Sequence, residues 1–306
     1  MSNEGGPVSA RAAPVSAVLR RALGQLPNGG PERQAVEAGE IDAVIDYGSA
    51  QVIAFPAARR ALRDAARRTD AARQEAKLDA PVANRVLATL PRAEYQQLLP
   101  GLEPVTLKFG EVIHEPGAPI RHVYFPIDCV VCLLATTEGQ RAVETGLVGY
   151  DGVVGITLAL GVAASPIRTQ VHVAGTALRL PAARFEVELQ RCPQLQRELL
   201  RYACVKMAQA RQTVACLIAH VFEQRLACWL LMTCDRSKSR EVLLTQAYLA
   251  NILHVRRESV TLASGSLQAR KLIRYSRGRI AILSHKGLEA ASCSCYSSIE
   301  ALQHLA

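Results

Sequence analysis

The sequence lacks an apolar run long enough to cross a membrane. Its longest uncharged stretch, residues 152–167, is broken by glycine and proline, whereas a spanning helix needs about 20 apolar residues. The first residues, Met-Ser-Asn-Glu-Gly-Gly, contain neither the basic nor the apolar part of a secretory signal. We therefore expect no membrane partner and a cytoplasmic location.

Cysteine is absent before Cys129, and the chain has nine cysteines, an odd number. In a reducing compartment such scattered residues are typical of buried small side chains or idle thiols. Close pairs do not change this expectation. Cys129 and Cys132 lie three apart in a predicted strand and so point to opposite faces, while Cys293 and Cys295 fall in a predicted helix, where positions i and i+2 diverge.

A twelve-residue interval also recurs among the cysteines, but we interpret it as accidental. Each step of twelve residues turns a helix about 120° beyond whole turns, so these side chains cannot share one face. The series is Cys192, Cys204, Cys216 and Cys228. We predict no metal site and no cofactor.

Signatures of catalysis are likewise missing: there is no phosphate-binding glycine loop, nucleophile elbow or recognisable pair of catalytic carboxylates. Three histidines in a strand-rich region, His114, His122 and His172, raise the alternative of a cupin-like metalloenzyme. Cupins need a His-x-His pair, and that spacing does not occur among these residues. We expect no enzymatic activity.

Positive charge is concentrated in the last third of the chain. The net charge is +9, and residues 201–306 carry 15 Lys/Arg against 6 Asp/Glu, whereas residues 1–80 and 81–200 are close to neutral. Within residues 245–286, Glu258 is the single acid among eight basic residues. Such a localised excess is the electrostatic footprint of a phosphate-backbone partner.

The chain divides into four segments that differ in composition and in hydrophobic pattern. Residues 1–80 form an Ala/Arg-rich extension of unassigned function, with a loose tail over 1–35, a strand over 41–46 and a helix over 56–68. Residues 81–190 contain short apolar runs separated by turns. Strands are expected at 123–125, 130–135 and 171–173, a pattern that favours a β-barrel or jelly roll.

Residues 191–222 are predicted to form one long helix with a heptad repeat. Apolar residues recur every seven positions, and a second series follows at an offset of three. This pattern predicts a dimer seam; a helix lying on its own domain is the alternative, and the two are compatible. The seam residues are Leu200, Ala203, Met207, Ala210, Val214, Leu217 and Val221.

Residues 223–306 contain two short predicted helices joined by a tight turn. Thr245 is a good N-cap for the first helix, and His254-Val255 forms the turn. The second helix begins at Arg256 and buries Val260, Ala263 and Leu267. This arrangement fits a helix-turn-helix whose second helix enters the major groove of DNA.

The outward residues of that second helix are suited to reading bases. Arg257, Glu258 and Thr261 lie on its first turns, where arginine can contact guanine and glutamate can accept a hydrogen bond from cytosine. A basic hairpin follows over 272–283 and resembles a wing that grips phosphates. The residues expected to contact the DNA backbone are Thr245, Arg256, Arg274, Arg277 and Arg279.

Residues 83–292 resemble the Crp/Fnr family of bacterial transcription regulators, most strongly over 244–283, where residues 257–260 are similar to the family's Arg-Glu-Thr-Val signature. The resemblance implies an α+β fold: a β jelly-roll sensor domain, a long dimerisation helix and a C-terminal winged helix-turn-helix. It also implies a homodimer on palindromic double-stranded DNA, and it leaves open a contact with RNA polymerase. His254 replaces the family's turn glycine, and Leu262 replaces a base-reading arginine of the catabolite activator.

The family's cyclic-nucleotide cassette is degenerate in this sequence. The corresponding positions are Gly155, Ile156, Arg168 and Thr169. Ile156 stands where nucleotide binders have the glutamate that holds the ribose, and an aliphatic side chain cannot accept a hydrogen bond. We therefore predict that cyclic AMP is not the effector, which leaves another small molecule or none.

Two further expectations follow from the same comparison. The N-terminal cysteines that hold the iron–sulfur cluster of the fumarate–nitrate branch are absent. A sensor or interaction module that has lost DNA binding remains as an alternative function. The arginines around the wing turn argue against it, because such a module has no reason to keep them.

Overall fold

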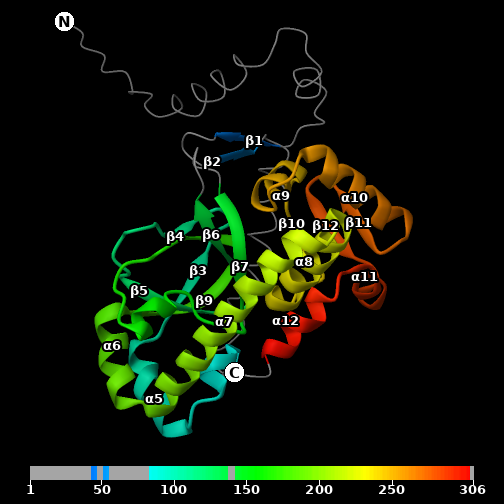
Figure 1. The fold of residues 1–306 in the computed structure, drawn as a ribbon. Coiled ribbons are helices and arrows are strands. Elements are labelled where there is room, and N and C mark those ends of the chain that lie inside the picture. Colours follow the sequence, from blue (N-terminus) through cyan, green and yellow to red (C-terminus); the bar gives the residue numbers. More distant parts are fainter. Residues whose placement is uncertain (1–42, 47–50, 55–82, 137–141, 304–306) are drawn as a thin grey trace, which may run out of the picture.

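The computed structural model describes residues 43–46, 51–54, 83–136 and 142–303. Strands β1 (Ala43–Asp46) and β2 (Gln51–Ala54) pair antiparallel, which confirms the strand predicted in this region. The pair lies beside helix α9 of the C-terminal part (Figure 1). The loose tail and the helix predicted over 56–68 lie outside the described residues.

The strand-rich segment folds into two antiparallel sheets, as predicted. One has the order β3-β9-β5 and the other β4-β8-β6-β7. The predicted strands over 123–125, 130–135 and 171–173 fall within β5, β6 and β8. The bounds are β3 (Glu103–Leu107), β4 (Val112–His114), β5 (His122–Pro126), β6 (Val130–Thr136), β7 (Ala142–Val148), β8 (Arg168–Val173) and β9 (Gly175–Pro181).

Short helices flank this β-roll and close one end of it (Figure 1). Buried Val123, Phe125 and Leu180 on the strands pack with Leu98 and Phe185 on the helices in one apolar cluster. Burial of these side chains holds the helices to the sheet. The helices are α4 (Arg85–Ala88), α5 (Arg92–Leu98), the 3-10 turns η2 (Leu99–Gly101) and η4 (Ile156–Leu160), and α6 (Ala182–Arg191).

Helix α7 (Pro193–Ala219) is the long helix expected from the heptads, and it runs diagonally across the β-roll (Figure 1). Two members of the predicted seam differ from expectation. Ala203 is buried within the chain, because the face that carries it lies on its own domain. Val221 lies beyond the helix, since α7 ends at Ala219 and Val221 caps the next helix.

The C-terminal part contains the predicted helix pair and hairpin. Strands β10, β12 and β11 form a small antiparallel sheet in that order, and the helices surround it. The bounds are α8 (Phe222–Ser237), β10 (Glu241–Leu243), α9 (Gln246–Ile252), α10 (Arg257–Ala269), β11 (Ile273–Ser276), β12 (Arg279–Ile282), α11 (His285–Ala291) and α12 (Cys295–Gln303). Among the described residues, no helix is long and apolar enough to cross a membrane.

The β-roll and the C-terminal helices share one hydrophobic core. Leu134 and Leu147 of the roll belong to the same buried cluster as Trp229 of α8 and Leu249 of α9. A buried ion pair reinforces this junction: Asp151, just after β7, lies 3.0 Å from Arg236 Nε on α8. The C-terminal helices are therefore packed on the β-roll through both apolar and charged contacts.

Candidate nucleic-acid interface

The helix-turn-helix is built from local signals that the sequence already carries. The Thr245 hydroxyl accepts a hydrogen bond from the Tyr248 backbone N–H at 3.1 Å and so caps α9. The turn residue His254 has a φ of 53°, the left-handed conformation that favours glycine. His254 therefore occupies a backbone conformation in which glycine would be less strained.

Helix α10 presents one apolar and one polar face. Val260, Ala263 and Leu267 are buried against the rest of the domain, as predicted. On the outer side, Glu258 and Thr261 are exposed. Leu262 is also outward and 76% exposed, so the position where the catabolite activator has an arginine offers an apolar surface here.

Arg256 and Arg257 start α10. Arg256 is its exposed N-cap residue, with an extended backbone, and Arg257 is half-buried. The Thr261 hydroxyl donates to Gln246 Oε1 at 3.0 Å. This contact ties the first turns of α10 to the beginning of α9.

The wing is a tight hairpin between β11 and β12. Its two turn residues, Arg277 and Gly278, both have positive φ, of 50° and 73°, as a two-residue type I′ turn requires. Arg274 and Arg277 are exposed. Arg279 is half-buried, and its guanidinium lies 2.8 Å from Glu241, so this predicted backbone contact already has an acidic partner.

Hydrogen bonds fasten the wing to the helix pair. The Tyr275 hydroxyl donates to the Leu244 carbonyl at 2.7 Å, and the Leu244 N–H donates to the Gly278 carbonyl at 2.7 Å. Leu244 directly precedes the capping residue Thr245. The start of α10, the start of α9 and the turn of the wing therefore form one rigid surface that carries the predicted contact residues.

This domain matches a family model over residues 224–291, whose description is the Crp-like helix-turn-helix domain. Because of this similarity, residues 224–291 are called the Crp-like domain below. No curated protein sequence matches the chain.

The described fold as a whole is similar to solved Crp/Fnr structures. One is a protein of Eubacterium rectale described as a transcriptional regulator of the Crp/Fnr family, with a TM-score of 0.53 and 16% identity over 68% of this chain and 97% of that one. FixK2 of Bradyrhizobium japonicum has a TM-score of 0.54 and 14% identity, over 63% and 98%. The c-di-GMP-responsive global regulator CLP of Xanthomonas campestris has a TM-score of 0.52 and 14% identity, over 63% and 100%. The α+β fold predicted from the resemblance, with its β-roll and winged Crp-like domain, is confirmed.

The degenerate cassette lies on the β-roll, away from the Crp-like domain in the sequence. Gly155 has a φ of 90° and starts η4, and Ile156 packs against the apolar cluster of the roll. Arg168 Nε lies 2.8 Å from Glu115, and the Thr169 hydroxyl is 3.2 Å from His114 Nδ1. Both polar side chains of the cassette therefore have protein partners.

Ionisable side chains are buried at the junction between the β-roll and the Crp-like domain. Burial lowers the pKa of His172 to about 3, and its Nδ1 lies 3.1 Å from the Tyr248 hydroxyl. Burial raises the pKa of Glu144 to about 7, although the Trp229 indole N–H donates to its carboxylate. Burial lowers the pKa of Lys206 to about 8. All three shifts are towards the neutral form because charge is costly in this interior, although Lys206 still carries its proton at neutral pH.

The structure differs from the sequence interpretation at two cysteines. Cys293 lies in the loop after α11 and Cys295 is the first residue of α12, so the two do not sit in one continuous helix. A helix through both positions, as the sequence predicts, would separate their side chains. They instead come together with Cys216 and His220 at the end of α7. Cys129 directly precedes β6 and Cys132 lies within it, and the two belong to different buried clusters.

Proposed function

We propose that the chain is a sequence-specific DNA-binding transcription regulator of the Crp/Fnr type. The observation that carries the proposal is the single surface formed by α10 and the wing, on a Crp-like domain that holds most of the chain's excess positive charge. A helix of this kind reads base edges in the major groove, and a basic wing grips phosphates. We propose an intracellular regulator without catalytic activity.

The proposal assigns base reading and backbone contact to two different groups of residues. Arg257, Glu258 and Thr261 read bases, because they lie on the first turns of α10. The residues that contact the backbone are Thr245, Arg256, Arg274, Arg277 and Arg279. Among these, Arg279 must leave Glu241 or share its charge with it, so we expect it to contribute less than Arg277.

We propose a homodimer that pairs through α7. The outward face of this helix leaves large apolar side chains exposed in the single chain: Met207 is 54% and Val214 57% exposed. Leu200 and Leu217 are exposed as well. A second copy of the helix would cover this stripe by heptad packing, and a two-fold dimer would present its reading helices to a palindromic operator.

The proposed effector is not cyclic AMP. Ile156 offers no acceptor for a ribose hydroxyl, and Arg168 already neutralises Glu115. A cyclic phosphate would have to break that ion pair before it gained a cationic partner. The regulator in Xanthomonas that responds to c-di-GMP illustrates that a protein of this fold can respond to another nucleotide.

Selection of bound sequences from random DNA, followed by salt titrations of the bound operator, tests the proposal. The variants are Glu258→Ala on α10 and Arg277→Ala on the wing. Glu258→Ala should relax preference at one base pair per half-site, with a discrimination of about 1–3 kcal/mol lost. Arg277→Ala should weaken binding to operator and scrambled DNA alike, and reduce the salt slope by up to about 1.

Glu289→Ala on α11 is the matched control, because it removes an acid of the same domain outside both surfaces. It should leave the base preference unchanged. The proposed docking is wrong if Arg277→Ala alters base preference while Glu258→Ala does not. Failure of the wild-type chain to enrich any sequence would reject DNA reading altogether.

A further inference from the structure

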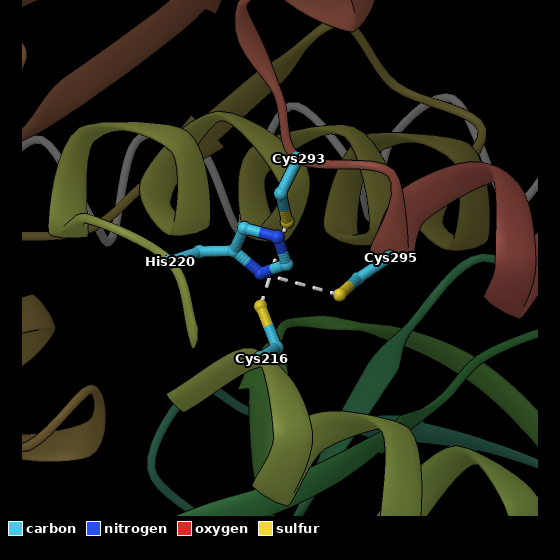
Figure 2. A group of neighbouring side chains, drawn as sticks. All are labelled: Cys216, His220, Cys293 and Cys295. Atoms are coloured by element: carbon cyan, nitrogen blue, oxygen red, sulfur yellow. Dashed lines mark hydrogen bonds between the residues drawn. The ribbon is translucent and has the colours of Figure 1, made fainter. Parts of the chain in front are cut away.

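Three cysteines and one histidine converge where α7 ends. Cys216 lies in the last turn of α7 and His220 directly after the helix, while Cys293 and Cys295 come from the segment between α11 and α12. Figure 2 shows the three sulfur atoms arranged around the imidazole ring. The four potential ligand atoms all lie within 4.8 Å of one another.

The fold itself produces this convergence. Cys216 and His220 are four residues apart, which places them on the same side of a helix end. Helix α12 lies against α7 (Figure 1), and this packing brings the two cysteines before and at its start onto that end. Cys293 and Cys295 are buried. The site therefore joins segments more than seventy residues apart in the sequence.

The distances suit a single tetrahedral ion. The Cys216 and Cys293 sulfurs are 3.5 Å apart, and the Cys295 sulfur is 3.5 Å from His220 Nδ1. Bond lengths of about 2.3 Å to sulfur and about 2.0–2.1 Å to nitrogen give tetrahedral edges of about 3.8 Å and 3.6 Å. These two distances are within about 0.3 Å of the tetrahedral values, and the remaining pairs lie within 4.8 Å. An iron–sulfur cluster needs more room, because several metal and sulfide atoms stand between its thiolates.

Neighbouring side chains offer hydrogen bonds and charge to the thiolates that a metal requires. Cys228 on α8 donates a hydrogen bond to the Cys293 sulfur. Gln212 Nε2 donates to the Cys295 sulfur at 3.1 Å. Arg225 adds a nearby positive charge that interacts with two of the thiols, which offsets part of the negative charge of three thiolates.

We propose that Cys216, His220, Cys293 and Cys295 bind one Zn²⁺ ion, which fastens the start of α12 to the end of α7. Three thiolates and one imidazole are a closed ligand set of the kind found in structural zinc sites. Thiolate ligands select zinc over the hard cations magnesium and calcium. Cys228 and Gln212 would support the ligands from outside the coordination sphere. This inference is independent of DNA binding.

The test uses the full chain purified under reducing conditions. Elemental analysis should find one zinc per chain, and replacement by Co²⁺ should give the intense visible bands of a tetrahedral ion with a thiolate charge-transfer band. In competition with a chelator, Cys295→Ser should bind zinc at least about 100-fold more weakly, because it removes a direct ligand. Cys228→Ala and Gln212→Ala each remove a hydrogen-bond donor to a ligand and should retain one zinc with about 10- to 100-fold lower affinity, the usual effect of an outer-shell change.

Cys204→Ser is the matched control, since Cys204 is an exposed cysteine on the same helix, and it should bind zinc as the wild type does. The cobalt spectrum of the wild type does not depend on whether any variant folds. The proposal is overturned if the reduced wild type takes up neither zinc nor cobalt, or if Cys295→Ser binds zinc unchanged. An iron–sulfur chromophore in protein purified without oxygen would equally overturn the single-ion site.

Discussion

Removing the charge of Asp151 should strongly destabilise the docking of the Crp-like domain. Asp151 and Arg236 are almost inaccessible to solvent, with side-chain exposures of 6% and 2%. Burial alone would raise the pKa of Asp151, but Arg236 and Lys206 outweigh it and hold that pKa below its usual value. The aspartate is therefore charged at neutral pH, and Asp151→Asn leaves a buried guanidinium without its counterion.

The magnitude follows from the geometry. At 3.0 Å and an effective dielectric of about 20, two unit charges attract by about 5–6 kcal/mol. Loss of one partner of a buried pair usually costs about 3–5 kcal/mol. The Met232 carbonyl still accepts a hydrogen bond from Arg236 Nη1 at 3.1 Å. We therefore expect Asp151→Asn to lower the free energy of unfolding by about 3 kcal/mol. A double variant, Asp151→Asn with Arg236→Met, should recover part of this loss, because the buried guanidinium is removed together with its partner.

The chain provides its own probe for this experiment. Trp229 is the single tryptophan of the sequence, and it is buried at the same junction, where its ring packs edge-on to His172 at 4.9 Å. Its fluorescence in a urea titration reports directly on docking. Asp151→Asn should shift the transition to lower urea, and the double variant should shift it less.

The matched control is Glu241→Gln, which breaks the exposed pair with Arg279 and should cost less than about 1 kcal/mol. If Asp151→Asn costs no more than Glu241→Gln, the buried pair does not hold the domains together. If the double variant is less stable than Asp151→Asn, the penalty does not come from an unpaired charge.

Four further predictions concern the dimer, the turn, pH and the effector. Met207→Glu with Val214→Glu should give monomers of unchanged secondary structure in sedimentation, because four charges would enter the seam; a persistent dimer would reject it. Substituting glycine for His254 should raise the free energy of unfolding by about 1 kcal/mol, since φ is positive there, and a urea titration that shows a loss would refute this. His172 is neutral in the fold and takes up a proton below pH 6.5 when unfolded, so stability falls as pH falls. Between pH 7 and pH 5 the wild type should lose about 2 kcal/mol more than His172→Gln, and parallel pH profiles would contradict the assignment. Isothermal titration with millimolar cyclic AMP should show no specific binding because of Ile156, whereas micromolar binding that changes DNA affinity would show that the cassette works.

The sequence predicted the features that depend on near neighbours. The cap at Thr245, the buried face of α10 with Val260 and Leu267, and the glycine-containing turn of the wing all follow from spacings of a few residues. The positive φ of His254 also has a signal in the sequence, because the family usually has glycine at that position. These features agree with the structure because local preference and tertiary packing favour the same conformation.

Features that join distant segments could not be predicted in the same way. The heptads identified an apolar stripe on α7 but could not tell that Ala203 packs on its own domain, since burial against either partner needs the same residue types. Arg236 and Asp151 are 85 positions apart, and nothing near either residue marks the other. The cysteine site was missed for a related reason. A predicted helix over Cys293 and Cys295 hides their proximity. The signal that identifies the site is the pair of spacings Cys-x-x-x-His, at Cys216 and His220, and Cys-x-Cys, at Cys293 and Cys295.

The core shared by the β-roll and the C-terminal helices limits how proteins of this fold can exchange domains by recombination. Trp229 and Leu249 belong to the Crp-like domain by sequence, yet the buried cluster that contains them includes Leu134 and Leu147 of the roll. A Crp-like domain joined to another protein at residue 223 would carry an apolar face that fits these strands. That face would fit another β-roll if β6 and β7 were transferred with it. The packing boundary between the two parts therefore does not coincide with a single junction in the sequence.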